Sequence, residues 1–484
     1  MLINRQDIRN IAFLVIAQGI TAVIGVITFL RYATVLTVPE LGRLSFVIAS
    51  TLLFGLLGEL GMRYVVMRET AQDTTRLRQF FYHSAVVRIL LSASSTVLLI
   101  GFIALIQPWQ AERDLLLLAA IVAVTTFAAD PATWILYGTG RGDLVGILLI
   151  IDRVLYLAAT LLAAHLFQSA AGILFAELIT NIIRGVISWL WVRPMLAQAA
   201  AGGWDTQIFK TLIVRGAVQG AAIIAYVTYS RLTVVVVQSG VSEAALGYYS
   251  FAFDVITLLL FVPVALLTAL FPTIARTKPE QMPQLHQQIA GLVLLLLPPL
   301  AIGLFLFAEQ TVTLWVGTRY APSVLLIRIL AVSTLASAFR FMYRQFLLAL
   351  NRPIPSVVFD VAGVGLLLGL GVPAASAYGG VGVAILYATL EFSLLFALML
   401  VSHRWLGLPH YAFLTLRALS ACLLPGLLAY LLTDNFIVRL GAYAAGASLC
   451  MVLFRVITPS QIRGAQGAAQ RMVQRVFRSA SGPA

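Results

Sequence analysis

The chain has 484 residues, of which 61% belong to the hydrophobic set and only 11% are charged. Soluble domains usually carry about a quarter charged residues, so this composition excludes a water-soluble globular protein. It also excludes disordered and collagen-like chains. The apolar residues come in blocks of about 20, the length at which a helix crosses the hydrocarbon core of a bilayer. The sequence therefore predicts an all-α polytopic membrane protein.

The charge balance is strongly basic, with 32 Lys and Arg against 19 Asp and Glu and a formal net charge of +13. In a membrane protein, such an excess is first explained by Lys and Arg that are retained on the cytoplasmic side. We therefore predict a lipid bilayer and not a nucleic acid as the partner. Both cysteines, Cys422 and Cys450, lie in apolar runs, which indicates neither a disulfide nor a metal ligand.

Fourteen apolar runs, separated by charges, Gly or Pro, follow one another along the chain, and each is long enough to span the membrane. Their boundaries, read from the pattern alone, are accurate to about four residues. The predicted spans cover roughly residues 10–31, 43–67, 84–106, 114–137, 145–167, 170–192, 214–238, 245–270, 288–314, 321–347, 354–376, 380–402, 412–432 and 436–457.

Positive charge recurs in every second connection between these spans. If the N-terminus lies inside, the inner segments contain Arg5 and Arg9; Arg68, Arg76 and Arg78; Arg141; Arg193 and Lys210; Arg276 and Lys278; Arg352; and Arg404. The outer connections contain few basic residues. Because Lys and Arg are retained in cytoplasmic loops, we predict that both termini are cytoplasmic.

Two inner segments have a mixed apolar and basic character. Residues 194–213 connect the sixth and seventh spans, and residues 459–484 form a basic C-terminal tail. Both patterns are compatible with amphipathic helices on an anionic inner leaflet. The alternative interpretation of the tail is a solvated basic segment that only fixes the topology.

The two halves of the chain share a short internal repeat. Gln18-Gly19 in the first span corresponds to Gln219-Gly220 in the seventh, and Leu41-Gly42 at the opening of the second corresponds to Leu246-Gly247 at the opening of the eighth. Because six spans separate the copies, the repeats are parallel. We predict two pseudo-symmetric six-helix lobes and two further helices. The predicted order is an N-terminal lobe, a cytoplasmic linker, a C-terminal lobe, helices 13–14 and the tail, at residues 1–193, 194–213, 214–402, 403–458 and 459–484.

Several stretches resemble the polysaccharide-transporter (Wzx-like) oligosaccharide flippases of the multidrug/oligosaccharidyl-lipid/polysaccharide exporter superfamily. The similarity covers most of residues 8–402 and is looser beyond them. The stretches that carry it are Leu41 to Glu69, Ala245 to Ala252 continuing to Phe271-Pro-Thr-Ile-Ala-Arg276, Ala308 to Gly317 with Tyr320-Ala-Pro, Asn351-Arg-Pro353, and Tyr378 to Ala384.

The resemblance implies fourteen helices in two lobes that work by alternating access. It implies a flippase of the bacterial inner membrane that moves an undecaprenyl-pyrophosphate-linked oligosaccharide from the inner to the outer leaflet. The product would feed cell-surface polysaccharides such as O-antigen, lipopolysaccharide or exopolysaccharide. Glycosyltransferases and a polymerase of the same pathway are the protein partners that it suggests.

Arginines inside the spans are the predicted substrate-binding residues. An ionisable side chain within a bilayer is costly unless it faces a partner or water, and a guanidinium can bind phosphate oxygens bidentately. The candidates are Arg231, its repeat partner Arg31, and the pair Arg340 and Arg344. The alternatives are a structural ion pair or interfacial snorkelling for Arg231, snorkelling for Arg31, and inside anchoring for Arg340 and Arg344. The resemblance also favours arginines in the first and seventh or eighth helices.

Carboxylates inside the spans are the predicted coupling or ion-pair residues, and they are Asp254, Glu391, Asp130 and Asp152. Each could pair with a cavity arginine or carry a proton, and Asp130 before Pro131 could also mark a hinge or be a structural polar group. Glu59 and Arg63 are four residues apart, so we expect a same-face pair on the second span.

The sequence lacks the G-x-x-x-x-G-K-[ST] loop of ATP-driven transporters, any His and Cys spacing typical of a metal site, and a catalytic constellation. We therefore predict a transporter without a cofactor or metal, and not an enzyme. A multidrug or cation antiporter of the same superfamily is the main alternative, and a lipid II flippase is a further one. A membrane polysaccharide polymerase or glycosyltransferase would need a catalytic group in a long outer loop, which this chain lacks.

Overall fold

The computed structural model describes residues 5–105, 113–200, 202–350, 352–407, 412–432 and 435–454, and every regular element in these ranges is a helix. Within them, thirteen helices are long and apolar enough to cross a membrane. One of these, α13 (Ile354–Leu406), contains a non-helical residue, Gly379 with φ 61°, and covers both the eleventh and the twelfth predicted spans. The prediction of about fourteen spans in an all-α membrane protein is therefore confirmed.

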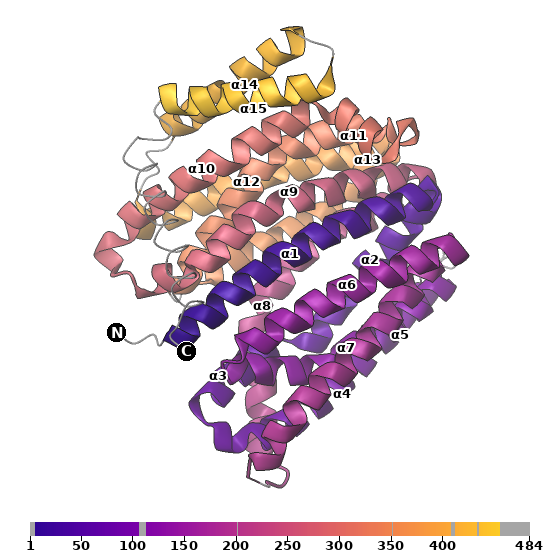
Figure 1. The fold of residues 1–484 in the computed structure, drawn as a ribbon, viewed down its shortest axis with the longest axis vertical. Coiled ribbons are helices and arrows are strands. Elements are labelled where there is room, and N and C mark those ends of the chain that lie inside the picture. The colour runs from indigo at the N-terminus through magenta and orange to yellow at the C-terminus, as the bar shows by residue number, and fades with distance from the viewer. Residues whose placement is uncertain are drawn as a thin grey trace, which may run out of the picture. The chain divides into compact units, whose positions relative to one another are not determined.

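Fifteen α-helices follow one another in the described part of the chain (Figure 1). They are α1 (Arg5–Val35), α2 (Val38–Glu59), α3 (Met62–Gln72), α4 (Leu77–Leu105), α5 (Arg113–Gly138), α6 (Gly142–Leu166), α7 (Ala170–Gln198), α8 (Thr206–Gln238), α9 (Glu243–Arg276), α10 (Met282–Leu306), α11 (Ala308–Val316), α12 (Ser323–Ala349), α13 (Ile354–Leu406), α14 (Ala412–Leu432) and α15 (Phe436–Leu453).

The chain divides into two compact units. The first contains Met1–Leu258, Val312–Leu330 and Arg352–Leu394, and the second contains Leu259–Thr311, Ala331–Asn351 and Leu395–Ala484. In the first unit, α1 lies along α6, and α7 packs against both α5 and α6 (Figure 1). In the second, α14 and α15 form a hairpin that packs on α10.

Polar caps define where several helices begin. The Thr37 hydroxyl accepts a hydrogen bond from the amide of Glu40 at the start of α2, and the Asp205 carboxylate accepts two at the start of α8. Before α4, both the hydroxyl and the amide of Thr75 donate to the Asp73 carboxylate. These hydrogen bonds hold the pKa of the Asp73 carboxyl below its ordinary range.

The second predicted span is not one continuous helix. α2 ends at Glu59, Leu60 and Gly61 adopt left-handed φ angles of 43° and 68°, and α3 begins at Met62. A left-handed pair breaks the i to i+4 spacing, so the expectation that Glu59 and Arg63 form a same-face helical pair is wrong. The two side chains still belong to one charged cluster, described below.

Helix takes up most of the predicted linker at residues 194–213. α7 continues to Gln198 and α8 begins at Thr206, so only a short connection separates them. That connection is fixed to the start of α4: the His83 ring stacks on Trp204, and its Nε2 accepts a hydrogen bond of 2.8 Å from the amide of Asp205. The predicted tail at residues 459–484 lies outside the described residues.

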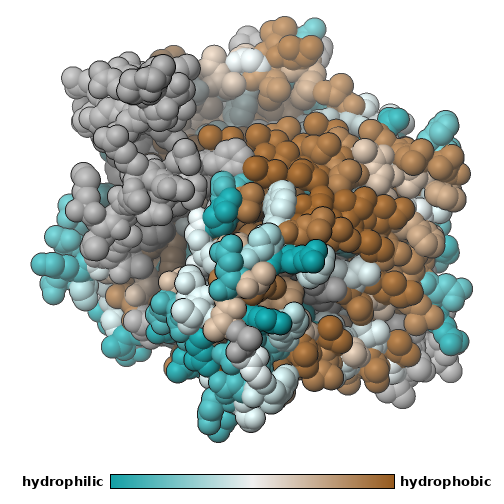
Figure 2. All heavy atoms as spheres, turned by 60° about the horizontal axis from the view of Figure 1, so that its bottom comes forward, coloured by the Kyte–Doolittle hydropathy of each residue, from teal (hydrophilic) through white to brown (hydrophobic). Residues whose placement is uncertain are grey.

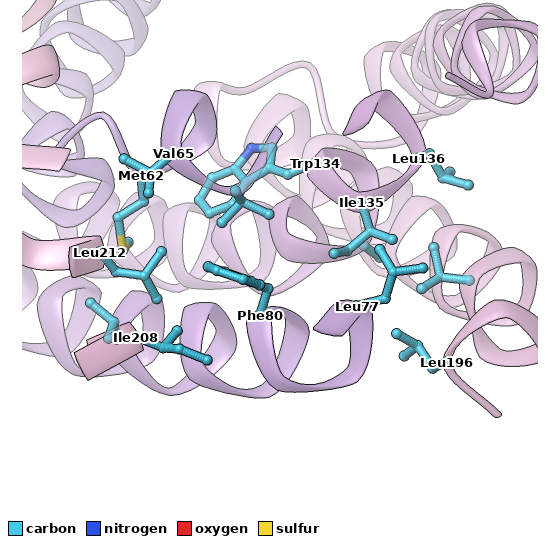
Figure 3. Close-up of a cluster of buried hydrophobic side chains, with 14 of the residues drawn as sticks. Met62, Val65, Leu77, Phe80, Trp134, Ile135, Leu136, Leu196, Ile208 and Leu212 are labelled. Carbon is cyan, nitrogen blue, oxygen red and sulfur yellow. The ribbon is translucent and has the colours of Figure 1, made fainter. Parts of the chain in front are cut away.

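The first turns of α8 are buried in an apolar core of the first unit. Ile208 and Leu212 lie against Met62 and Phe80, together with Trp134 of α5 (Figure 3). All five side chains are at most 4% exposed. Burying a leucine or phenylalanine in this way stabilises a fold by about 1.5–3 kcal/mol.

Many large apolar side chains point outward instead. Leu162, Val186 and Val361 are each more than half exposed. Figure 2 shows a broad brown area of such residues, with hydrophilic residues gathered beside it on the same face. An exposed apolar surface of this kind is expected where helices meet lipid and not water.

Candidate functional site, buried charges around a cavity

A cavity of about 150 Å³ lies within the first unit, among α3, α5, α6 and α7. Its polar lining consists of Arg63, Asp130, Thr133, Tyr137 and Arg184. Trp134, Val145, Leu148 and Leu149 complete the lining. Two guanidinium groups therefore share one largely apolar cavity, where charges interact more strongly than in water.

Arg88 of α4 is an almost completely buried charge, with its residue 1% exposed. Its Nη2 lies 2.8 Å from Oδ2 of Asp130, and its guanidinium lies 5.7 Å from the centre of the Trp134 ring. Because a buried ion has lost its hydration, such a pair persists only with close and well-aligned partners. Asp130 was predicted as a coupling or ion-pair residue, and it is an ion-pair partner.

Arg63 lines the same cavity with a different partner. Its guanidinium lies 5.2 Å from the centre of the Tyr137 ring. Among the described residues, no carboxylate lies within 4 Å of it, although Glu59 is within electrostatic range of Arg63, Arg88 and Asp130. Arg63 is therefore held mainly by an aromatic face, an arrangement that leaves donors available to an anion.

A second charged group lies on α6 and α7. Asp152 is 8% exposed and lies 3.8 Å from Nε of Arg184 and 3.9 Å from Nε of Arg153. Glu177 is within electrostatic range of all three residues. Both ion-pair distances are close to the 4 Å limit, so the carboxylate is shared loosely between two cations. Asp152 was predicted as a coupling or ion-pair residue, and the structure places it beside two arginines.

A third charged group joins α8 and α9. Nη1 of Arg231 lies 3.7 Å from Oδ1 of Asp254, and both side chains are about one-quarter exposed, at 27% and 25%. Tyr32 of α1 is within electrostatic range of both. Arg231 and Asp254 were predicted separately as substrate-binding and coupling residues, and the structure brings them together.

The other predicted site residues are not among those that line this cavity. Arg31 is on an exposed face of α1 and lines a separate cavity with His165. Glu391 belongs to the first unit and is 2% exposed. Arg340 and Arg344 belong to the second unit, where they are 5% and 7% exposed. In the described residues, no group of three or more His, Cys, Asp or Glu could hold a metal ion.

Sequence analysis missed Arg88, Arg63 and Arg184 as site residues. The fourth helix begins at Leu77 and not at residue 84, so Arg88 lies about 16 Å along it and not at its inner end. A signal was present, because Arg88 shares one buried helix face with three serines at spacings of three or four residues. These are Ser84, Ser92 and Ser95.

Comparisons with known proteins agree with this architecture. The family model for "polysaccharide biosynthesis protein" matches residues 8–278, more than half of the chain. No curated protein sequence matches the chain.

Among solved structures, the lipid II flippase MurJ in an inward closed conformation has a TM-score of 0.75 at 12% identity, covering 91% of this chain and 98% of that one. An inward-facing multidrug resistance MATE family transporter has a TM-score of 0.59 at 14% identity, with coverages of 81% and 93%. A MOP superfamily transporter from Pyrococcus furiosus has a TM-score of 0.58 at 14% identity, with coverages of 82% and 94%.

At such identities the likeness to solved structures concerns the fold alone, a polytopic helical fold that those flippase and transporter structures share with this chain. The family match covers the helices that build the cavity and its charged groups. The chain therefore belongs to the polysaccharide biosynthesis protein family.

Proposed function

We propose that the protein flips an undecaprenyl-pyrophosphate-linked oligosaccharide from the inner to the outer leaflet of a bacterial inner membrane, as a step in cell-surface polysaccharide synthesis. Both termini are cytoplasmic in this proposal, and the lobes at residues 1–193 and 214–402 alternate in access. The observation that carries it is the placement of Arg63 and Arg184 in one cavity among membrane-spanning helices. A neutral or cationic substrate would not require these cations.

The chemistry of the cavity suits a pyrophosphate. A guanidinium offers five N–H donors in a planar fork that matches phosphate oxygens, and charge-assisted hydrogen bonds of this kind are about twice as strong as neutral ones. Arg63 has no carboxylate within ion-pairing distance among the described residues. It is therefore the first residue that we assign to the phosphate, followed by the loosely paired Arg184.

The carboxylates beside the arginines provide a way for the substrate phosphate to be released. Asp152 and Asp130 each lie beside an arginine that a phosphate could recruit. When the phosphate leaves, the carboxylate can pair with the vacated guanidinium, so the empty cavity does not retain uncompensated charge. Protonation of the carboxylates would bias the same exchange and couple it to a proton gradient, and Arg231 with Asp254 is a second pair that can act in this way.

Substitution of the cavity arginines tests the proposal. Arg63→Ala should reduce flipping by about tenfold to a hundredfold, because hydrogen bonds to charged groups contribute about 1.5–3 kcal/mol. Arg63→Lys should recover part of the loss, since it restores charge but not the planar fork. The measurement is the rate at which a lipid-linked oligosaccharide in proteoliposomes becomes accessible to a membrane-impermeant oxidant.

Arg68→Ala is the matched control, because Arg68 lies on the same helix and is exposed. Flipping at the rate of the unaltered protein by an Arg63→Ala/Arg184→Ala double variant would rule out the cavity assignment. Lipid II is a second candidate substrate, which the similarity to a protein named for lipid II flipping favours. Supplying lipid II in the same proteoliposomes distinguishes the two substrates.

A further inference from the structure

A second cavity lies near the C-terminal ends of α1 and α6, with a volume of about 240 Å³. Arg31 and Val35 contribute to it from α1, and Leu161, Ala164 and His165 contribute from α6. Gln168, in the turn that follows α6, completes the lining. The polar groups at this cavity are a guanidinium, an imidazole and an amide, and no carboxylate is among its lining residues.

Arg31 differs from three other arginines in the spans of the first unit. Arg88, Arg184 and Arg231 each lie within 4 Å of a carboxylate. The guanidinium of Arg31, in contrast, has no ion-pair partner among the residues that the structure describes, and only its backbone carbonyl takes part in a hydrogen bond with Thr34. Its charge is therefore available to an anion from outside the chain.

The backbone places Gln168 at this cavity at an energetic cost. Its φ of 48° lies in the left-handed region, which a non-glycine residue rarely occupies. Such strain persists where the surrounding structure imposes it, and it is more frequent at binding sites than elsewhere. The Gln168 amide can donate hydrogen bonds to the same anion as Arg31 and His165.

An exposed apolar stripe runs along α1 and ends at Arg31. Ile16, Ile20, Val23 and Ile27 precede Arg31 at spacings of three or four residues, which places all five on one helix face. The four apolar residues are 42–61% exposed. The stripe therefore presents hydrocarbon to the surroundings and ends in a cation.

A corresponding stripe runs along α6 and ends at His165. Val154, Ala158 and Leu161 precede His165 at spacings of three or four residues, and all four are exposed. α1 and α6 lie side by side within the first unit (Figure 1), and the two stripes end at Arg31 and His165 of the same cavity, so together we call them the apolar track. At its polar end, Leu166 and Phe167 are 60% and 61% exposed, so lipid and not only water surrounds the site.

We propose that this cavity, formed by Arg31, His165 and Gln168, binds the phosphate of a membrane lipid whose hydrocarbon chains lie along the exposed apolar stripes of α1 and α6. The phosphate accepts hydrogen bonds from the three side chains, and the chains exclude water from the track. The site is separate from the cavity of Arg63 and Arg184 and does not depend on the substrate proposed for it. With the predicted topology, it serves the outer leaflet.

Native mass spectrometry with purified full-length protein tests the proposal, using phosphatidylglycerol as the probe. The tightest bound lipid should be about tenfold weaker in Arg31→Gln, because a charge-assisted contact is lost. Arg31→Lys should retain most of the affinity. The matched control is Arg193→Gln, which removes an exposed charge from α7, a helix that does not line this cavity.

Two further arms identify the ligand. A photoactivatable phosphatidylglycerol should label peptides from α1 and α6, and Arg31→Gln should abolish this labelling. Inorganic phosphate at the same concentration should not displace the lipid, because it lacks the chains. Unchanged lipid affinity and labelling in a correctly folded Arg31→Gln variant would overturn the site, and displacement by inorganic phosphate would overturn its assignment to a lipid. If Arg63→Ala loses flipping but keeps normal lipid labelling, the lipid site at Arg31 is independent of the substrate proposed for the cavity of Arg63 and Arg184.

Discussion

Helix α2 meets helices of the second half of the predicted repeat at both of its ends, and different contacts form the two junctions. At its start, Gly42 faces Gly247 of α9. A methyl group at Gly42 would lie 2.6 Å from the carbonyl oxygen of Glu243 and 2.8 Å from the amide nitrogen of Gly247. Beside the glycines, Arg43 and Glu243 form a bidentate ion pair at 2.8 and 2.9 Å.

At the end of α2, Gly61 faces α8. A methyl group at Gly61 would lie 2.5 Å from the amide nitrogen of Gly220 and 2.7 Å from the carbonyl oxygen of Gly216. This junction also has an ion pair, Arg215 with Glu69 at 3.1 Å. In addition, it continues into the apolar core that buries the first turns of α8 (Figure 3).

The difference shows which junction can open at lower cost. Separating the start of α2 from α9 exposes two glycines and a half-exposed ion pair, and an ion pair of this kind contributes at most about 1 kcal/mol. Separating α8 from the end of α2 would expose Ile208 and Leu212, each at a cost of about 1.5–3 kcal/mol. The α2–α9 junction is therefore the weaker of the two, and the first turns of α8 are held more firmly to the N-terminal helices.

The largest effect on the thermal unfolding midpoint is expected from a substitution at Gly61. Gly61→Ala forces a methyl group against the backbone of α8 and also carries the left-handed penalty of about 1–2 kcal/mol. Gly140 has a similar φ of 73° but no atom within 4 Å of an added methyl group. Gly140→Ala should therefore lower the thermal unfolding midpoint only by the left-handed penalty, and Gly61→Ala by clearly more. Equal midpoints in the two variants would contradict close packing at this junction.

An intermediate effect is expected at the other end of α2, on conformation and not on stability. Gly247→Ala would collide with the carbonyl oxygen of Val38 and push α9 away from α2, while alanine improves helix propensity by up to about 1 kcal/mol. The thermal midpoint should change little. Cross-linking by a short bis-maleimide between cysteines at Arg43 and Glu243, in a background without Cys422 and Cys450, should fall severalfold.

Gly25→Ala provides the control for this experiment, because no atom lies within 4 Å of its added methyl group. Undiminished cross-linking in Gly247→Ala would show that the start of α2 does not depend on this close approach. A large loss of stability in the same variant would show that the two junctions are equally rigid, which would remove the basis of the comparison.

The smallest effect is expected from the ion pair at the start of α2. The Arg43 and Glu243 side chains are 37% and 35% exposed, so their coupling in a double-mutant cycle should be about 0.5–1 kcal/mol. Arg43→Glu should weaken cross-linking of the junction at nearby positions, and Arg43→Glu with Glu243→Arg should restore part of it. Salt should reduce the difference, since it screens exposed charges. A coupling energy near zero would show that the glycines, and not the ion pair, determine the contact between the start of α2 and α9.

Much of the fold could be predicted because the bilayer imposes a local requirement. A run of about 20 apolar residues is visible in the sequence without knowledge of its neighbours. For this reason the membrane spans could be predicted, including the two spans that α13 forms on either side of Gly379. The break at Leu60 and Gly61 could not be found in this way. It has no proline, and the need for a left-handed glycine arises only from the approach of α8.

Individual charged residues of the candidate site could be predicted from the sequence, but the way they pair with one another could not. Arg231, Asp254, Asp130 and Asp152 stand out because a charge inside an apolar run is costly. Their partners do not, because Arg88 pairs with Asp130 across 42 residues and Arg184 pairs with Asp152 across two helices. The spacing of Arg88 with its neighbouring serines indicates a buried polar face, but not which carboxylate that face meets.

The sequence by itself determined that this is a helical membrane protein with about fourteen spans, an internal repeat and a set of charges within its spans. These properties follow from composition and short-range periodicity, which the bilayer thickness and the helix period translate directly into structure. Only the tertiary structure decided which charges neutralise each other, why Arg31 is left for an outside ligand, and which glycines let helices touch. Those outcomes depend on distances of a few ångströms between residues far apart in the chain, and such distances are set by packing.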